Sequence, residues 1–221
     1  MVAFVADESK PRTRTAPTKK GQLTRARIMD AGRDVLSERG YFGATVAEIA
    51  EKSSLSLGAI YRYFENKDVL FLEILEELVE ELYTAVSGSW TKGEEFESLR
   101  ESSRRYLTTY YSNRHLIAGL IEMSAAVPEC AELWWNLKQK TFRRKERYLQ
   151  RNLPASPLKA EYAAVALATM VEQLAYHWYV ESEKHGGQAP SLEEATETVS
   201  LIWYRSIYAD IGSEAIKAPV D

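Results

Sequence analysis

A short polar segment near residue 60 combines the side-chain types that contact a nucleic acid. Tyr61 and Tyr63 offer phenol hydroxyls, Arg62 a guanidinium, Ser56 a hydroxyl and Leu57 an apolar tip. Hydroxyls and a guanidinium bind phosphate oxygens, a guanidinium also bonds to guanine edges, and an apolar tip can touch a thymine methyl. The alternative is that the two tyrosines are core aromatics. The set favours nucleic-acid binding rather than catalysis.

The first of two short helices is expected to begin just before this segment. Thr45 and Glu48 have the spacing of a capping box, in which each side chain satisfies a backbone N–H of the first turn. Val46, Ile49 and Ala50 then repeat at helical spacing. We therefore expect a helix that ends in the serine pair before residue 55.

The second short helix is expected over residues 57–64 and carries the polar segment. Ser56 is a good N-cap residue for it. A helix of this length is not stable alone, so we expect Ile60 and Phe64 to pack on neighbouring elements. Two short helices with a turn of three or four residues and a polar second helix match the helix-turn-helix plan, whose second helix enters the DNA major groove.

The chain from Thr24 to about Leu75 resembles the N-terminal domain of the TetR family of transcriptional repressors. Residues 58–70, GAIYRYFENKDVL, fit a phrase that the family often carries, G-x-x-Y-x-Y-F-x-x-K-x-x-L. The resemblance covers about a quarter of the chain. The matching residues are Ile28, Ala31, Gly40, Thr45, Ile49, Ala50, Ser56, Gly58, Ile60, Tyr61, Tyr63, Phe64, Lys67 and Leu70.

This resemblance implies DNA-binding roles for eight residues. The residues at positions that usually hold the DNA backbone are Thr45, Tyr61, Tyr63 and Lys67. Those that face the bases are Ser56, Leu57, Gly58 and Arg62. The family often has Lys where this chain has Leu57 and Thr where it has Ala59. Hydrogen-bond readout therefore falls mainly on Arg62.

The predicted fold class is all-α, with about nine helices. Residues 1–22 are predicted to be a disordered basic arm, residues 23–70 a three-helix DNA-binding domain, and residues 71–221 a helical domain for ligand binding and dimerisation. Besides the two short helices, we expect helices over 24–40 (with Thr24 as N-cap), from Asn66 to about 86, and over 94–112, 115–127, 128–152, 158–184 and 191–211. Arg12, Arg14, Lys19 or Lys20 of the arm could add phosphate contacts; a leader without a role is the alternative.

Aromatic and apolar side chains of the later helices could line a pocket for a small, largely apolar effector. Apolar walls with a few polar points define such pockets. The alternative is that these residues only fill the core, and a cavity is implied mainly by the family resemblance. The candidates are Tyr106, Tyr110, Met123, Trp134, Trp135, Phe142, Met170, Gln173, Tyr176 and His177.

The last two predicted helices are the expected homodimer surface. Small residues within 158–184 permit close helix approach, and Leu201, Ile202 and Trp203 offer an apolar face. In the family two such helices from each subunit form a four-helix interface, and two-fold symmetry matches a palindromic site on double-stranded DNA. Alternatively, these residues face the core of their own chain.

Charge is distributed unevenly along the chain. Residues 1–70 hold 12 basic and 9 acidic side chains, a net charge of +3, while the remaining 16 basic and 23 acidic side chains give −7. A basic front on an acidic body fits a protein that places one end on a polyanion. A solvated tail on an acidic protein is the alternative.

Other classes of protein lack positive signals. No apolar run approaches the roughly 18 residues that span a bilayer, no secretion signal is visible, and the single cysteine, Cys130, favours a reducing cytoplasm. We find no metal-ligand spacing, phosphate loop or nucleophile elbow. We therefore expect no metal, no cofactor and no enzymatic activity.

The sequence supports the hypothesis of a cytoplasmic, ligand-responsive repressor that leaves its operator when an effector binds. The rivals are a non-specific DNA-binding protein, which the acidic body argues against, and a helical enzyme that uses the body cavity. The effector, the operator sequence and the direction of regulation do not follow from the sequence.

Overall fold

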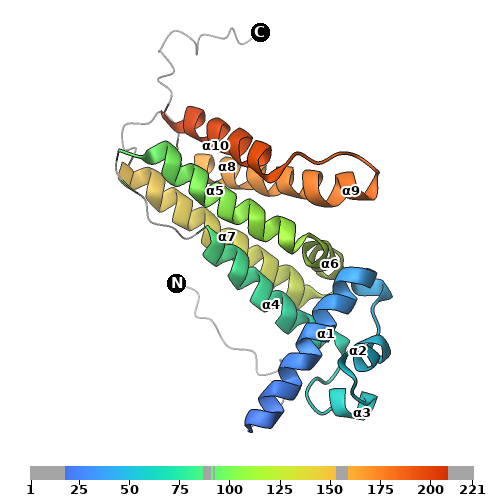
Figure 1. Cartoon of the computed structure of the whole chain (residues 1–221). Coiled ribbons are helices and arrows are strands. Elements are labelled where there is room, and N and C mark those ends of the chain that lie inside the picture. The colour runs from blue at the N-terminus through green and yellow to red at the C-terminus, as the bar shows by residue number, and fades with distance from the viewer. Residues whose placement is uncertain (1–17, 87–90, 92, 153–158, 209–221) are drawn as a thin grey trace. The chain divides into compact units, whose positions relative to one another are not determined.

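The computed structural model describes residues 18–86, 91, 93–152 and 159–208. Every regular element within these ranges is helical, as predicted (Figure 1). The elements are α1 (Lys19–Gly43), α2 (Val46–Ser53), α3 (Leu57–Ile60), α4 (Lys67–Ala85), α5 (Glu95–Ser112), α6 (Arg114–Ser124), α7 (Pro128–Asn152), α8 (Ala160–Tyr176), the π-helix η1 (His177–Glu181), α9 (Ser182–Lys184) and α10 (Leu192–Tyr208).

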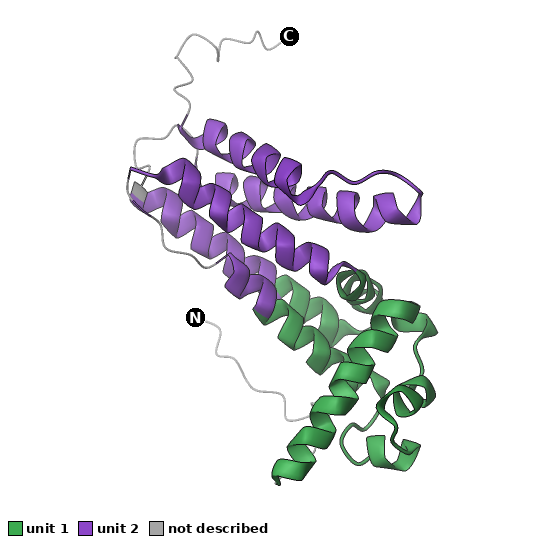
Figure 2. Cartoon of the chain, in the orientation of Figure 1, with its two compact units in different colours: residues 1–80, 115–135 green, residues 81–114, 136–221 purple. Residues whose placement is uncertain are grey.

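The chain forms two compact units, coloured separately in Figure 2. The first, which we call the N-terminal unit, contains the described residues up to Glu80 together with His115–Trp135. The second, the C-terminal unit, contains Glu81–Arg114 and the described residues from Asn136 onward. Helices α4 and α7 therefore contribute to both units, and α6 belongs to the N-terminal unit with α1, α2 and α3. The three functional domains predicted above remain a prediction.

Helix α1 begins earlier than the sequence predicted. The Thr18 side chain accepts a hydrogen bond from the backbone N–H of Gly21 and is the N-cap. The predicted cap, Thr24, lies inside the helix and donates its hydroxyl to the carbonyl of Lys20. Both threonines are good N-cap residues, and the prediction of Thr24 was wrong because Thr18, further upstream, starts the helix. Residues 19–22 of the predicted arm are thus helical, while residues 1–17 lie outside the described residues.

Gly40 interrupts α1, as expected of a stop residue. Its backbone has φ 67° and ψ 177°, and φ lies in the left-handed region that favours glycine. The chain then makes one more turn, in which Tyr41 is buried and Phe42 is 69% exposed. Only the first of these two aromatics therefore fills the core.

Apolar side chains of α1 to α4 make the core of the N-terminal unit. Each fully buried side chain of this size contributes about 1.5–3 kcal/mol, which explains how helices as short as α2 and α3 persist. The residues with at most 1% exposure are Ile28, Leu36, Ile49, Ile60, Phe64, Leu70, Phe71, Ile74, Leu75 and Leu78.

In the C-terminal unit, α5 packs along α10. The Phe96 and Tyr204 rings meet edge to face, and the Tyr148 and Tyr208 hydroxyls lie 2.7 Å apart. Helix α10 opens with a capping box: the Glu194 carboxylate accepts from the Ser191 backbone N–H, and the Glu194 backbone N–H donates to the Ser191 hydroxyl.

The long helix predicted over 158–184 is observed with an irregular segment. It starts at Ala160 and runs through α8 into η1 and α9, with a π-turn over His177–Glu181. A π-turn inserts one residue into the helical repeat, which the spacing of apolar residues did not indicate.

Candidate nucleic-acid interface

The two short helices and their turn are built by local hydrogen bonds. Thr45 and Glu48 form the predicted capping box, with both reciprocal bonds present. The hydrogen bond from the Thr45 hydroxyl holds the pKa of the Glu48 carboxyl below its usual value. Ser54 takes left-handed backbone angles (φ 55°) and ends α2, and the Ser56 side chain accepts from the Ala59 N–H to start α3.

Helix α3 is shorter than predicted. It covers only Leu57–Ile60, and the chain continues through a turn in which the N–H groups of Tyr63 and Phe64 both donate to the Ile60 carbonyl. We call residues 56–63 the recognition segment. A helix of one turn is not stable alone, so packing on neighbouring elements, rather than helix propensity, stabilises α3.

The side chains of the recognition segment divide cleanly between core and surface. Ile60 is 1% exposed, as predicted for its buried face. Leu57 is 46% exposed and Tyr61 is 51% exposed. Arg62 is exposed and Tyr63 is half-buried. The alternative that these tyrosines are core aromatics is therefore wrong for Tyr61.

Two of the predicted contact residues have open surroundings. A Cβ atom built on Gly58 would meet no heavy atom within 4 Å. Thr45 is exposed at the start of α2. The hydroxyls of Thr45 and Ser56 both serve as N-caps, of α2 and α3 respectively.

Lys67 begins α4, as expected, but its ammonium makes contacts that the sequence did not predict. Its ammonium donates to the Tyr41 carbonyl at 3.0 Å and to the Ala44 carbonyl at 3.2 Å, and it sits 4.6 Å from the Tyr41 ring centroid. Two of the three N–H donors of the ammonium are therefore used inside the protein. At the start of α4 the expected cap is present, because the Asn66 side chain accepts from the Val69 N–H.

Two arginines of α1 contact the residues on either side of the recognition segment, and sequence reasoning missed both contacts. The Arg25 guanidinium lies 5.2 Å from the Phe64 ring centroid and pairs with the Glu73 carboxylate. Arg27 donates to the Ser53 carbonyl at the end of α2, at 2.6 Å. The Glu73 side chain is only 18% exposed, with Oε1 buried and unpartnered within the described structure. In the sequence, only the basic residues near the start of α1 indicated that Arg25 and Arg27 could make such contacts.

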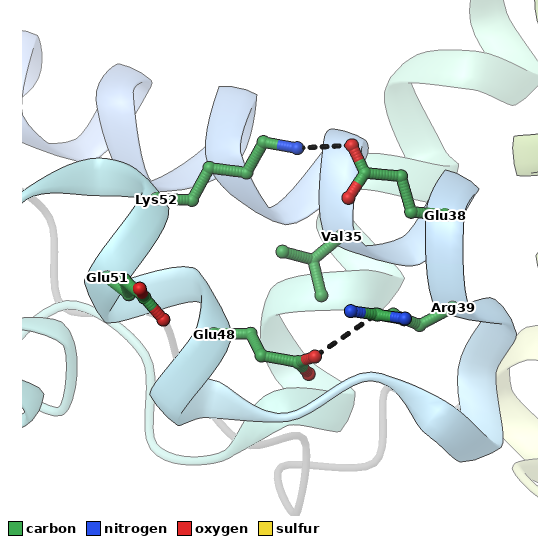
Figure 3. A pocket seen from close by; sticks show the side chains of 6 residues that line it. All are labelled: Val35, Glu38, Arg39, Glu48, Glu51 and Lys52. Carbon is green, nitrogen blue, oxygen red and sulfur yellow. Dashed lines mark hydrogen bonds and ion pairs between the residues drawn. The ribbon is translucent and has the colours of Figure 1, made fainter.

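A pocket of about 270 Å³ opens between α1 and α2 (Figure 3). The Lys52 ammonium donates to Glu38 at 2.5 Å, which raises the pKa of Lys52, and Arg39 pairs with Glu48 at 3.2 Å. Val35 and Glu51 complete the lining. Three carboxylates and two cations line the pocket, so its lining carries no excess of positive charge that would attract a polyanion.

The ten residues predicted to line an effector pocket divide between the two units. Met123, Trp134 and Trp135 lie in the N-terminal unit, and the other seven lie in the C-terminal unit. Tyr110 and Met123 are fully buried. Those of intermediate exposure are Tyr106, Trp134, Phe142, Met170 and Tyr176.

Three of those ten side chains are exposed rather than facing an interior. Trp135 is 60% exposed. Gln173 lies on the outward side of α8, and the exposed His177 imidazole pairs with Glu181 at 3.0 Å. Of the three polar points expected on the pocket wall, Gln173 and His177 are therefore on the surface, and Tyr110 is buried.

A polar cluster in the C-terminal unit was not predicted. Lys138 and Glu172 form an ion pair at 2.8 Å, and their side chains are 28% and 18% exposed. Burial, with the nearby Glu172 charge, raises the pKa of the Tyr106 and Tyr110 phenols, whose rings lie 5.8 Å apart. Lys138 and Glu172 come from different helices, so no local spacing in the sequence marks them.

The described residues offer little for other chemistry. They hold no group of three or more His, Cys, Asp or Glu side chains that could bind a metal ion. Cys130 is buried, and burial raises the pKa of its thiol, which disfavours the nucleophilic thiolate. Within the same ranges, no helix has the length and apolar character needed to cross a membrane.

The expected dimer residues fall on different faces of α8 and α10. Trp203 is buried beneath the Lys145 ammonium, 4.3 Å from its ring, so it faces its own unit. Its neighbour Ile202 is 39% exposed, because consecutive helical residues point about 100° apart. On α8, Tyr162 and Val165 are exposed.

Taken together, the capped helix pair and the outward side chains of the recognition segment define a DNA-binding helix-turn-helix protein. Residues 28–74 match the family model described as "Bacterial regulatory proteins, tetR family". The chain belongs to the TetR family of DNA-binding transcriptional regulators.

Relatives support this assignment over different lengths. The regulator EthR of Mycobacterium tuberculosis is 26% identical over 213 residues, which are 91% of this chain and 95% of EthR. The uncharacterised regulator YuxN of Bacillus subtilis is 29% identical over 114 residues, 48% of this chain but only 38% of YuxN. The chain thus spans well under two thirds of YuxN.

The fold is shared with a solved regulator. NalD of Pseudomonas aeruginosa, the secondary repressor of the MexAB-OprM multidrug efflux pump, superposes with a TM-score of 0.66. The match has 18% sequence identity and covers 87% of this chain and 100% of NalD. At this identity the likeness shows the fold alone.

Proposed function

We propose that this protein is a homodimeric repressor that binds a palindromic operator through its recognition segment and releases it when a small, largely apolar effector binds. The observation that carries the DNA-binding part is the division of the segment. Ile60 anchors it in the core, while Leu57, Tyr61 and Arg62 project outward. Exposed large apolar and aromatic tips beside a guanidinium are typical of a binding surface.

Gly58 provides a second, independent argument for the same DNA-binding surface. A glycine inside a helix is less favourable than alanine by about 1 kcal/mol. No neighbour within 4 Å requires its small size. Close approach of DNA to the backbone supplies a reason for glycine that the folded chain itself does not.

The contacts we propose follow from the chemistry of each side chain. Arg62 bonds to a guanine edge and Leu57 covers a thymine methyl, since these are the base features that such side chains fit. Tyr61, Tyr63 and Thr45 hold phosphates. Lys67 mainly fixes the turn at Ala44, and its third N–H is left for a phosphate.

Dimerisation through α8 and α10 is supported by their exposed apolar side chains. Tyr162, Val165 and Ile202 are 63%, 40% and 39% exposed in the single chain. A two-fold dimer presents two recognition segments to half-sites about 34–36 Å apart, one turn of DNA. We accordingly propose a palindromic operator and a cytoplasmic location.

The effector part of the proposal rests on the C-terminal unit. Tyr106 and Tyr110 supply aromatic surface beside the Lys138–Glu172 ion pair, which is the arrangement of apolar walls with few polar points expected of a ligand site. Release of DNA requires that the effector bind the DNA-free arrangement more tightly than the DNA-bound one.

Selection from genomic DNA tests the function. Purified protein is mixed with genomic fragments, and the retained fragments are sequenced. We expect an enriched inverted repeat whose half-site centres lie about 10 base pairs apart. Arg62→Ala should relax one position of each half-site, while Arg143→Ala, which removes an exposed arginine of α7, should leave the motif unchanged. Uniform retention without a motif would overturn specific regulation and favour the non-specific DNA-binding alternative.

A further inference from the structure

Glu122 of α6 makes a hydrogen bond across the N-terminal unit to the backbone at the break in α1. Its Oε2 atom accepts from the Tyr41 N–H at 2.9 Å, although the two residues lie 81 positions apart in the chain. The break at Gly40 turns this N–H out of the helix and makes it available. A carboxylate acceptor strengthens such a bond relative to a neutral one.

The packing around this bond is close. A Cβ atom on Gly40 would lie 2.6 Å from Glu122 Oε2. One turn earlier on each helix, a Cβ atom on Gly119 would lie 2.9 Å from a Leu36 methyl carbon. Helices α6 and α1 therefore touch through two glycines, one on each helix, and the carboxylate fills the space beside Gly40.

The segment that Glu122 holds is tied to both helices that flank the recognition segment. Lys67, the first residue of α4, donates to the carbonyls of Tyr41 and Ala44. The Tyr41 hydroxyl donates to Asp68 at 2.9 Å. Ala44 directly precedes Thr45, the N-cap of α2. The Gly40–Ala44 turn thus fixes where α2 begins and where α4 begins.

We infer that Glu122 is a positioning residue for DNA binding, which acts from α6 by holding the Gly40–Ala44 turn and, through it, the ends of α2 and α4. This inference rests on the proposed DNA-binding function. It links α6, which lies outside the predicted DNA-binding domain of residues 23–70, to the recognition segment through this turn.

Variants at position 122 test the inference with the full-length chain and the duplex recovered by selection. Glu122→Ala should weaken duplex binding by roughly tenfold, the size expected from losing one charge-assisted hydrogen bond. Glu122→Gln keeps an acceptor oxygen and should restore most of the affinity. Glu132→Ala removes an equal charge from an exposed site on α7 and should bind like the wild type.

Two readouts separate positioning from contact and from unfolding. Because no phosphate contact is lost, the dependence of affinity on salt should keep its slope in Glu122→Ala, whereas losing a phosphate contact lowers the slope by about 0.9. Amide hydrogen exchange at Tyr41, measured without DNA, should accelerate in Glu122→Ala and stay slow in Glu122→Gln.

Wild-type affinity in Glu122→Ala, with faster exchange at Tyr41, would overturn the positioning role and leave the proposed function standing. An equal loss of duplex affinity in Glu122→Ala and Glu122→Gln would also overturn it, since the acceptor oxygen at position 122 would then not matter. Failure of the wild-type protein to select any duplex would instead reject the proposed function on which the inference rests.

Discussion

Replacing Gly58 by alanine should stabilise the protein and weaken its binding to DNA. Helix α3 gains from the change because alanine is favoured over glycine in a helix by about 1 kcal/mol. The added methyl group meets no protein atom within 4 Å, so no clash offsets this gain. For a chain of this length, we expect the midpoint of thermal unfolding to rise by about 2–4 °C.

The same methyl group points into the space where the major groove is proposed to lie. A side chain that must give way at a DNA contact costs at least as much as a mismatched base pair, about 1–3 kcal/mol. We therefore expect the dissociation constant for the selected duplex to rise by about ten- to a hundredfold. Fluorescence anisotropy at one fixed salt concentration measures this change.

Gly187→Ala is the matched control for this prediction. Gly187 is exposed just after α9 in the C-terminal unit, and its added Cβ would come no closer than 3.3 Å to another atom, the Cβ of Ser182. It should change stability modestly and leave DNA affinity unchanged. If Gly58→Ala is more stable and binds DNA as tightly as the wild type, the outward face of α3 does not contact DNA and the reasoning is refuted.

Three further predictions concern other side chains of the N-terminal unit. Arg62→Ala should lower specific affinity by about 1–3 kcal/mol and relax discrimination at one base pair, which competition with single-mismatch duplexes measures; equal losses on all duplexes would contradict base readout. Arg25→Ala leaves the Glu73 carboxylate buried without its cation and should destabilise the fold by about 3 kcal/mol, measured by urea unfolding; a loss below 1 kcal/mol would show that the pair is unimportant. Burial and the hydrogen bond to Asp68 raise the pKa of Tyr41 from 10.0 to about 12. The neutral phenol therefore contributes stability that is fully present below pH 10 and lost between pH 10 and 12. The Tyr41→Phe variant lacks this group, so its free energy of unfolding should fall less across that interval. Identical alkaline unfolding curves for the variant and the wild type would contradict this.

Local signals predicted the elements that build the candidate site. The capping box of Thr45 and the N-cap at Ser56 were confirmed because each depends on residues within three positions of the cap. The buried pair Ile60 and Phe64 was also predicted correctly from helical spacing. Family resemblance added the roles of these residues, which spacing alone does not supply.

Long-range partners could not be predicted from the sequence. The carbonyl groups that hold Lys67 belong to Tyr41 and Ala44, 26 and 23 residues away, so the sequence offered only its position at a helix start. Glu73 shares the glutamate-rich stretch of α4 with residues that are exposed. Only its pairing with Arg25, from another helix, buries it.

The C-terminal unit was harder to predict for a related reason. Aromatic residues there serve both cores and pockets, and the spacing along one helix does not tell which side of it faces a cavity. The π-turn at His177 shifts the helical register by one residue, and no local pattern announces it. The ion pair of Lys138 and Glu172 joins two helices and was missed for the same reason.

Photo-crosslinking to the selected duplex tests most directly whether the recognition segment touches bases. Thymines of the half-site are replaced one at a time by 5-iodouracil, the complex is irradiated and digested with trypsin, and the DNA-linked peptides are identified by mass spectrometry. Cleavage after Lys52 and Arg62 releases residues 53–62 as one peptide, SSLSLGAIYR, which contains Leu57 and Tyr61. The account predicts that this peptide carries the crosslink. Crosslinks confined to other peptides, with none in residues 53–62, would contradict it.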